Sequence, residues 1–283
     1  MFTDSHCHLN FPELVSQLPA IRQAMAEAQV TRALCICTTL EEFDGVHALA
    51  MAHDNFWSTV GVHPDNEGIA EPSVQDLLDR AALPRVVAIG EIGYDEMTPA
   101  EEFAYQAQLK MAVDYDMLVM VHSPHRDKKR GVLRSMDVAR EMGVPMHKLI
   151  IDHNNEETVR DVLDYGAWAA FTIYPNTKMG SARMVEIVRE YGPERIIVDS
   201  SADWGVSDPL SVPKTAKLML ERGIDPAAVE LTTWSNAIAA YAQSGQIDVD
   251  ALMQTPVIDQ RQSYSDNSVL RGQKPRVDEP VPN

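Results

Sequence analysis

The chain has 283 residues, 45% of them hydrophobic, and a formal net charge of -18 at pH 7. This length and hydrophobic content suffice for one large α/β domain or two small ones. The negative charge disfavours non-specific binding to duplex DNA, although a basic patch or a metal site could still hold a single phosphate. We expect a cytoplasmic protein, because no segment approaches the run of about 18 apolar residues that a membrane helix needs and no secretion signal is recognisable.

Short apolar runs, which are typical of buried strands, recur eight times along the chain. They lie at 2–6, 32–38, 57–63, 85–91, 117–122, 148–153, 168–173 and 195–199. Helical spacing of apolar residues predicts a helix after each run, at 13–28, 41–53, 74–82, 99–115, 132–142, 156–165, 181–191 and 209–222. Gly143, Gly166 and Gly223 follow three of these segments and are expected to end the helices.

Alternation of strands and helices requires parallel strands that are joined by crossover helices. Eight such units close into a (β/α)8 TIM barrel, which is the fold that we expect for a single domain at residues 1–255. An open doubly wound sheet is the alternative, but no G-x-G-x-x-G or P-loop motif follows the first strand. Residues 256–283 are polar and contain prolines, and they predict an arm that either packs over the barrel or is mobile.

Two histidines, His6 and His8, stand two residues apart in the first predicted strand, with Asp4 behind them. Side chains two apart share one face of a strand, so both imidazoles could reach one metal ion. A single H-x-H is weak support for a metal site, because two ordinary polar residues give the same pattern. In a parallel barrel, however, the carboxyl ends of all strands gather on one face. Further ionisable residues end or closely follow later strands: His63, Glu91, His122, His153, Asp199 and Asp203.

Glu91 lies near two glycines, Gly90 and Gly93, at the end of its predicted strand, where other groups can approach the backbone closely. A carboxylate has two oxygens and can join two metal ions, which a histidine cannot do; a turn or helix-capping acid is the alternative. For His122 and His153, each taken alone, a hydrogen-bonded core histidine is the alternative. Their equivalent positions on consecutive strand units favour metal ligands.

The order of these motifs resembles that of the TatD-like metal-dependent hydrolases, which belong to the amidohydrolase-type barrel superfamily. The matching motifs are H-x-H at 6–8, G-V-H-P at 61–64, G-E-I-G-Y-D at 90–95, and then His122 and His153. The resemblance covers roughly residues 3–205.

The resemblance implies a divalent-metal-dependent hydrolase with two bound ions. One ion would be held by His6, His8, Glu91 and a late aspartate, and the second by Glu91, His122 and His153. His63 would contact the substrate near the ions. Two ions about 4 Å apart would bring the pKa of a water between them toward neutrality and hold the attacked group in line. Nitrogen and oxygen ligands suit zinc first, with manganese, magnesium or nickel as alternatives.

The chain departs from the family pattern at the late aspartate. The family's last strand ends in E-T-D, whereas the corresponding run here reads V-D-S-S-A-D-W-G, and an ungapped match places Ser201 at the ligand position. Asp199 and Asp203 lie two residues to either side and would share its strand face if the backbone stayed extended. We favour Asp203 as the ligand and Asp199 as a proton-accepting acid behind it, although the roles could be exchanged. The candidate catalytic residues are Glu91, His63, Asp199 and Asp203.

A second departure is the basic segment 122–131, which carries His125, Arg126 and Lys128 in a chain that is otherwise acidic. A solvated charge run before a helix is one interpretation. Recognition of an anion is the other, because a guanidinium can bind phosphate or carboxylate in a bidentate manner. Three residues after the seventh strand could complete such a pocket: Tyr174, Asn176 and Lys178.

The sequence is consistent with three candidate functions. The first is hydrolysis of a phosphoester or another small anionic ester, with Arg126 and Lys178 selecting the anion. The second is a TatD-like deoxyribonuclease acting on DNA ends; the net charge weighs against nucleic acid, but a single-stranded end in a cleft needs few contacts. The third is a non-catalytic metal-binding component of a pathway, which the nearly complete ligand set disfavours. The sequence leaves the oligomeric state open.

Overall fold

The structure is a computed structural model, and it describes residues 1–65, 74–174, 177–203 and 205–250. One compact unit spans Met1–Asp248. Its eight strands are β1 Phe2–Cys7, β2 Val30–Cys35, β3 Phe56–Val60, β4 Val86–Gly93, β5 Val119–His122, β6 Leu149–Ile151, β7 Trp168–Thr172 and β8 Ile196–Asp199. The predicted arm at 256–283 and the domain boundary at 255 lie outside the described residues, so they stay predictions.

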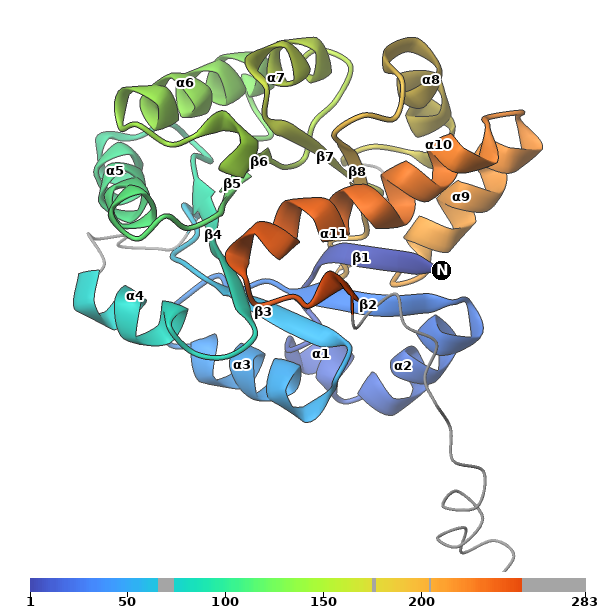
Figure 1. Cartoon of the computed structure of the whole chain (residues 1–283), viewed down its shortest axis with the longest axis horizontal. Helices are drawn as coiled ribbons and strands as arrows, with labels where there is room; N and C mark the ends of the chain where they lie inside the picture. The colour runs from blue at the N-terminus through green and yellow to red at the C-terminus, as the bar shows by residue number, and fades with distance from the viewer. Residues whose placement is uncertain (66–73, 175–176, 204, 251–283) are drawn as a thin grey trace, which may run out of the picture. The chain divides into compact units, whose positions relative to one another are not determined.

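The strands form one parallel sheet in the order of the chain, from β1 to β8. Cys7 forms a parallel bridge with Ala202, and the amide of Ser201 donates to the carbonyl of His6 at 2.8 Å. The segment after β8 therefore meets the end of β1, and the sheet curls into a nearly closed barrel with helices around its outside (Figure 1). This arrangement confirms the predicted (β/α)8 TIM barrel.

Helices follow the strands and cover the outer face of the barrel. They are α1 Pro12–Val15, α2 Leu18–Glu27, α3 Phe43–Ala52, α4 Val74–Ala81, α5 Pro99–Asp114, α6 Lys128–Glu141, α7 Val159–Tyr165, α8 Ser181–Tyr191, α9 Ser211–Glu221, α10 Pro226–Glu230 and α11 Asn236–Tyr241. The single helix predicted at 13–28 is divided into α1 and α2. Pro19 explains the division, because a proline has no amide hydrogen and fits only the first turn of a helix.

The stretch from Pro226 to Tyr241 is helical although the sequence analysis predicts no helix there. A π-helical turn, Leu231–Ser235, joins α10 to α11. The side-chain amide of Asn236 donates to the carbonyl of Ile196 at 2.7 Å, and the Arg32 guanidinium lies 4.6 Å from the centre of the Trp234 ring. These contacts lie at the amino-terminal ends of β8 and β2. The stretch thus covers that end of the barrel, across which α11 runs in Figure 1.

The strands are buried on both faces. Every residue of β3, β4, β5, β6 and β8 is buried, which explains why these strands appear in the sequence as continuous apolar runs. Polar residues are the exception within the strands, and several of them lie at the carboxyl-terminal ends. None of the helices that the structure describes has the length and apolar content needed to cross a membrane.

Candidate metal centre

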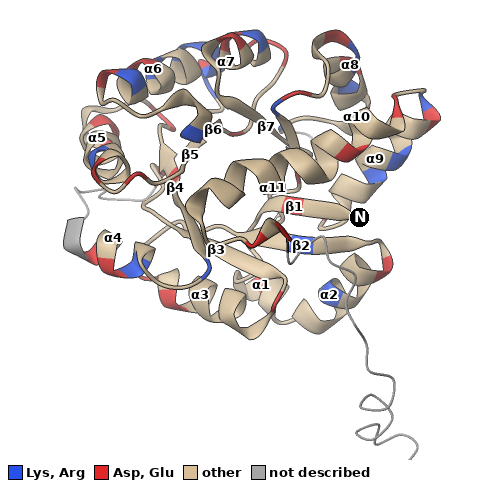
Figure 2. Cartoon of the chain, viewed as in Figure 1, with Lys and Arg blue, Asp and Glu red and all other residues tan. Residues whose placement is uncertain are grey.

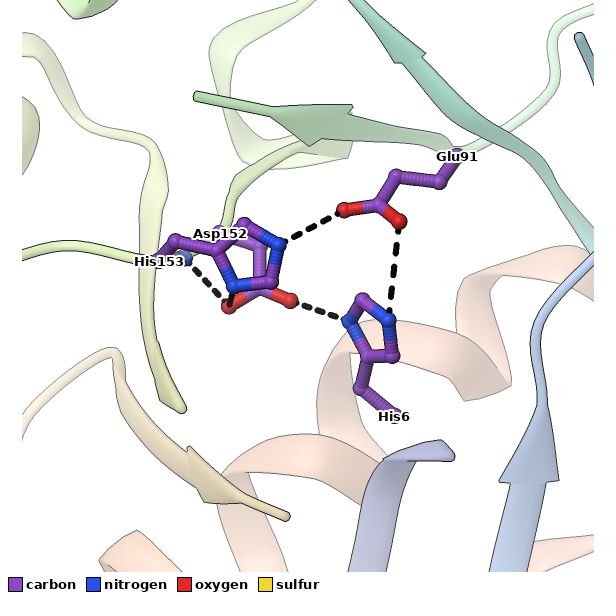
Figure 3. Close-up of side chains that lie close together, drawn as sticks. All are labelled: His6, Glu91, Asp152 and His153. Atoms are coloured by element: carbon purple, nitrogen blue, oxygen red, sulfur yellow. Dashed lines mark hydrogen bonds and ion pairs between the residues drawn. The ribbon is translucent and has the colours of Figure 1, made fainter. Parts of the chain in front are cut away.

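Four buried ionisable side chains meet at the carboxyl-terminal end of the barrel. His6 comes from β1, Glu91 from β4, and Asp152 and His153 directly follow β6. Figure 3 shows the four side chains pointing toward one another, and one donor atom of each lies within 4.8 Å of the others. Their exposed fractions are 3% or less. Such a group of nitrogen and oxygen atoms, shielded from water, can hold a divalent cation.

Glu91 is shared with a second group, which adds His63 and His122. Its Oε1 lies 3.0 Å from His153 Nε2 and 3.1 Å from His122 Nδ1. Its Oε2 lies 3.5 Å from His6 Nε2 and 3.7 Å from His63 Nε2. Burial raises the pKa of Glu91, but the imidazoles of His6 and His122 lower it well below its usual value. The carboxylate is therefore charged, and each of its oxygens faces two imidazoles.

His8 stands beside His6, with 3.1 Å between their Nε2 atoms. Its Nδ1 lies 3.3 Å from the carbonyl of Ile36, and its ring stacks on Phe11. Burial, followed by the charge of His6, lowers the pKa of His8 to about 3, so its imidazole is neutral. Among the described residues, the buried Nε2 of His122 has no hydrogen-bond partner. The neutral imidazole of His8 and the unpartnered nitrogen of His122, close to a charged carboxylate, fit a bound metal ion.

Two of the histidines are oriented by groups behind them. His6 Nδ1 makes a short hydrogen bond with a carboxylate oxygen of Asp152. His153 Nδ1 lies 2.7 Å from the hydroxyl of Thr172, which donates to Asp199 Oδ1 at 2.8 Å. Because that hydroxyl uses its only proton on Asp199, it must accept from His153. The proton of His153 is then on Nδ1, and the lone pair of its Nε2 faces the site.

The two acids proposed for the late ligand lie apart from both donor groups. Asp199 is fully buried, its Oδ2 has no hydrogen-bond partner among the described residues, and burial raises its pKa well above the usual value. Asp203 Oδ1 accepts from the Tyr174 hydroxyl at 2.9 Å and from the amide of Gly205 at 2.7 Å. The expected extended backbone does not continue between them, because Ser201 has a φ of 42°. Their carboxylates therefore do not share one strand face.

Sequence reasoning missed Asp152. Neighbouring residues of a strand point to opposite faces, so only one of Asp152 and His153 is expected to face the barrel interior. His153, however, has a φ of 57°, in the left-handed region, and the alternation stops there. Both side chains consequently reach the same site. The sequence signal that could have found Asp152 is its place directly after an apolar strand and directly before a proposed ligand.

Two further acids near the site were also not predicted. Asp65 Oδ1 lies 2.5 Å from His63 Nδ1, and Asp95 Oδ1 lies 3.6 Å from His122 Nε2. Asp65 follows its histidine by two residues, and Asp95 closes the G-E-I-G-Y-D motif, so both were visible in the sequence. A carboxylate beside an imidazole fixes the ring and increases its basicity.

The donor groups open into a cavity of about 650 Å³. Of the predicted substrate contacts, His63, His125, Tyr174 and Lys178 line this cavity. Arg126 is exposed and does not belong to its lining, and Asn176 lies outside the described residues. Of the two cations predicted to select the anion, Lys178 therefore lies at the donor groups and Arg126 does not.

The basic segment after β5 is partly neutralised by acids. Lys129 Nζ lies 3.2 Å from Asp161, and next to the segment the guanidinium of Arg134 pairs with Glu102. Lys128 turns inward and donates to the hydroxyl of Ser123 at 2.9 Å. Figure 2 shows acidic and basic residues mixed over the helices and loops outside the barrel. The segment thus forms no uniform basic surface.

Comparison with known proteins agrees with this geometry. A family model described as TatD related DNase matches residues 3–242. An uncharacterized metal-dependent hydrolase of Methanocaldococcus jannaschii is 30% identical over 64% of this chain and 72% of its own length. The 3'-5' ssDNA/RNA exonuclease TatD of Citrobacter rodentium is 28% identical over 74% of this chain and 86% of its own. The phosphotriesterase homology protein of Escherichia coli shares the fold, with a TM-score of 0.66, 15% identity, and coverage of 85% and 98%.

Proposed function

Because the chain belongs to the family of TatD-related DNases and is a metal-dependent hydrolase, we propose that it hydrolyses a phosphoester or another small anionic ester. One observation carries this proposal: imidazoles from four strand ends converge on the two oxygens of a single buried carboxylate. The imidazoles belong to His6, His63, His122 and His153, and the carboxylate to Glu91. Such a donor set suits divalent cations, which bind and polarise phosphoryl oxygens.

The proposal includes two divalent ions, with zinc as the first candidate and manganese, magnesium or nickel as alternatives. The two donor groups that share Glu91 support two neighbouring positions. The three cysteines are buried and belong to neither group, so imidazole and carboxylate are the proposed ligands. These ligands are His6, His8, Glu91, His122 and His153. Bound ions would supply positive charge that favours ionisation of water and offsets the charge of the ester.

The chain's own side chains position and move protons in this proposal. Asp152 and Thr172 keep the imidazoles of His6 and His153 aimed at the site. His63 lines the cavity beside Glu91 and is paired with Asp65, so it can exchange a proton with water or with the leaving oxygen. Asp203 and Asp199 stay the two candidates for the late carboxylate. To bind an ion, Asp203 would have to leave Tyr174 and the amide of Gly205.

The anionic part of the substrate is proposed to lie against Lys178, Tyr174 and His125, which line the cavity. An ammonium and a phenol hydroxyl both donate to phosphate or carboxylate oxygens. Arg126 is a weaker candidate, since its exposed side chain is not part of the lining.

A second candidate is exonuclease activity on single-stranded nucleic acid. The 28% identity with a protein named 3'-5' ssDNA/RNA exonuclease favours it. The net charge of -18 weighs against binding of a duplex, whereas a single-stranded end entering the cavity needs few contacts. A non-catalytic metal-binding role is disfavoured, because the hydrolase ligand set is nearly complete.

An activity screen tests the proposal. The protein would be loaded with Zn²⁺, Mn²⁺, Mg²⁺ or Ni²⁺ and offered phosphomonoesters, phosphodiesters, lactones, amides and single-stranded DNA. We expect turnover of a phosphoester that His122→Ala abolishes and that His147→Ala preserves, because His147 is exposed in the turn before β6. Turnover that survives His122→Ala would remove the proposal. Cleavage of DNA alone, falling steeply with added salt, would favour the exonuclease.

A further inference from the structure

The ammonium of Lys178 lies among the proposed metal ligands. Its Nζ is 3.4 Å from His153 Nε2 and 3.2 Å from the hydroxyl of Ser201. The backbone holds the lysine there, because the amide of Met179 donates to the carbonyl of Thr172 and the amide of Tyr174 donates to the carbonyl of Met179, both at 3.1 Å. The contact with His153 Nε2 uses the very lone pair that a metal ion would need.

No carboxylate among the described residues lies within ion-pair distance of Lys178 Nζ. Its charge, 3.4 Å from His153 Nε2, repels a divalent cation at the same place.

In the described part of the chain, the groups that contact Lys178 Nζ carry no negative charge. Ser201, which an ungapped match places at the position of the late ligand, contributes a neutral hydroxyl that faces the ammonium. Asp203 is turned toward Tyr174 and Gly205, and Asp199 toward Thr172. A lysine and a serine thus stand where a cation and its carboxylate ligand would otherwise be expected.

We propose that Lys178 is a fixed cation that makes the two metal positions unequal, so that the protein holds one divalent ion tightly and a second only weakly. The weak position is the one beside His153 and Ser201, and the tight position is the one held by Glu91 and His122. Lys178 there replaces part of the second ion's charge and contacts the anionic group of the substrate. This inference rests on the proposed function, and it specifies how that site binds its metal and its substrate.

Metal stoichiometry tests the inference without an activity measurement. Purified protein would be loaded with excess Mn²⁺ or Zn²⁺, passed through a desalting column, and measured for metal and protein content, with calorimetric titration of the apoprotein in parallel. We expect about one retained ion per chain in the wild type and about two in Lys178→Met. In the titration, Lys178→Met should tighten the weaker site by about tenfold or more.

Three controls make each result decisive. Lys178→Arg keeps the charge and should retain one ion, which separates charge from the length and shape of the side chain. Lys214→Met removes an exposed lysine that pairs with Asp208, and it should behave as the wild type. Lys178→Gln serves as the neutral variant if thermal unfolding shows that Lys178→Met is not folded.

Two outcomes would overturn the inference while leaving the proposed function intact. They are two tightly retained ions in the wild type, and a neutral Lys178 variant whose stoichiometry and second affinity match those of the wild type. A wild type that binds no ion would instead contradict the proposed function itself. In the active enzyme, Lys178→Met should also raise KM for an anionic ester more than it lowers kcat, since the ammonium contacts the bound substrate.

Discussion

Thr172 is the residue on which the orientation of His153 depends. Its hydroxyl accepts from His153 Nδ1 and donates to Asp199 Oδ1, so one small side chain fixes both a ring and a buried acid. Groups that fix metal-binding histidines in this way typically change metal affinity by about 10- to 100-fold when they are removed. The sequence contained no sign of this role, because a threonine at the end of a strand is also a common structural residue.

We expect Thr172→Val to weaken the binding of the ion beside His153 by about 10- to 100-fold, because the valine keeps the volume but removes the hydrogen bonds to His153 and Asp199. Competition with a fluorescent chelator would measure this affinity. Thr215→Val is the matched control, because Thr215 is equally buried but bonds to Ser181 instead. An unchanged affinity in Thr172→Val would show that packing alone holds the imidazole.

Asp203→Asn tests the late ligand that the sequence favours. The carboxylate of Asp203 is held by Tyr174 and Gly205, so we expect the variant to keep the metal content of the wild type. Elemental analysis after desalting would measure it, with Asp199→Asn analysed in parallel. A loss of metal in Asp203→Asn would show that this side chain turns into the site when an ion binds, as the sequence prediction requires.

At the scale of single elements, helix α5 is joined to the site through its first turn. Thr98 and Glu101 form a capping box, in which each side chain accepts from the backbone amide of the other. Glu101 also accepts from the amides of Asp95 and Glu96, both at 3.0 Å. One buried carboxylate therefore fixes both the start of α5 and the loop that places Asp95 near His122.

We expect Thr98→Ala to lower the free energy of unfolding by about 1 kcal/mol, which is the usual effect of removing an N-cap. Glu101→Ala should cost more, because three backbone amides lose their acceptor. Urea unfolding followed by circular dichroism would compare the two variants. If Glu101→Ala were no more destabilising than Thr98→Ala, water must replace the carboxylate at those amides.

The boundaries of the elements show what local sequence can and cannot predict. Gly166 has a φ of 91° and ends α7, and Gly143 and Gly223, also at positive φ, follow α6 and α9 as expected. These stops were predictable because only glycine adopts that backbone region without strain. His153 and Ser201 also have positive φ, but their residue types do not predict it. The backbone at His153 lets the side chain of Asp152 reach the site, and the backbone at Ser201 separates the side chains of Asp199 and Asp203.

For the whole molecule, the barrel was predictable because the alternation of strands and helices is regular and excludes most other folds. The helical stretch 226–241 was missed because eight complete units leave no place for it in the barrel pattern. Most of the proposed ligands could also be identified from the sequence, because each lies at the end of an apolar run. The groups that orient these ligands were not predictable, because Asp152 and Thr172 are brought to the site only by the closure of the sheet.

Metal binding should stabilise the whole molecule, because the ions are proposed to bind the folded barrel and not the unfolded chain. At a free concentration about 1,000 times the dissociation constant, the gain is about 4 kcal/mol, which corresponds to a rise of roughly 10 °C in Tm for a protein of this size. Differential scanning calorimetry of the apoprotein, with and without Zn²⁺, would measure the shift. His122→Ala should show a smaller shift, and an equal shift in that variant would place the stabilising ion elsewhere.

The helical stretch 226–241 covers the amino-terminal end of the barrel, and the barrel interior is filled by side chains. Among the residues that the structure describes, the site therefore opens only at the mouth that holds the proposed ligands. For the proposed ester substrate, both products of hydrolysis would leave through the same opening by which the next substrate molecule enters. An anionic product would bind the same positive groups as the substrate. The reaction should therefore show product inhibition.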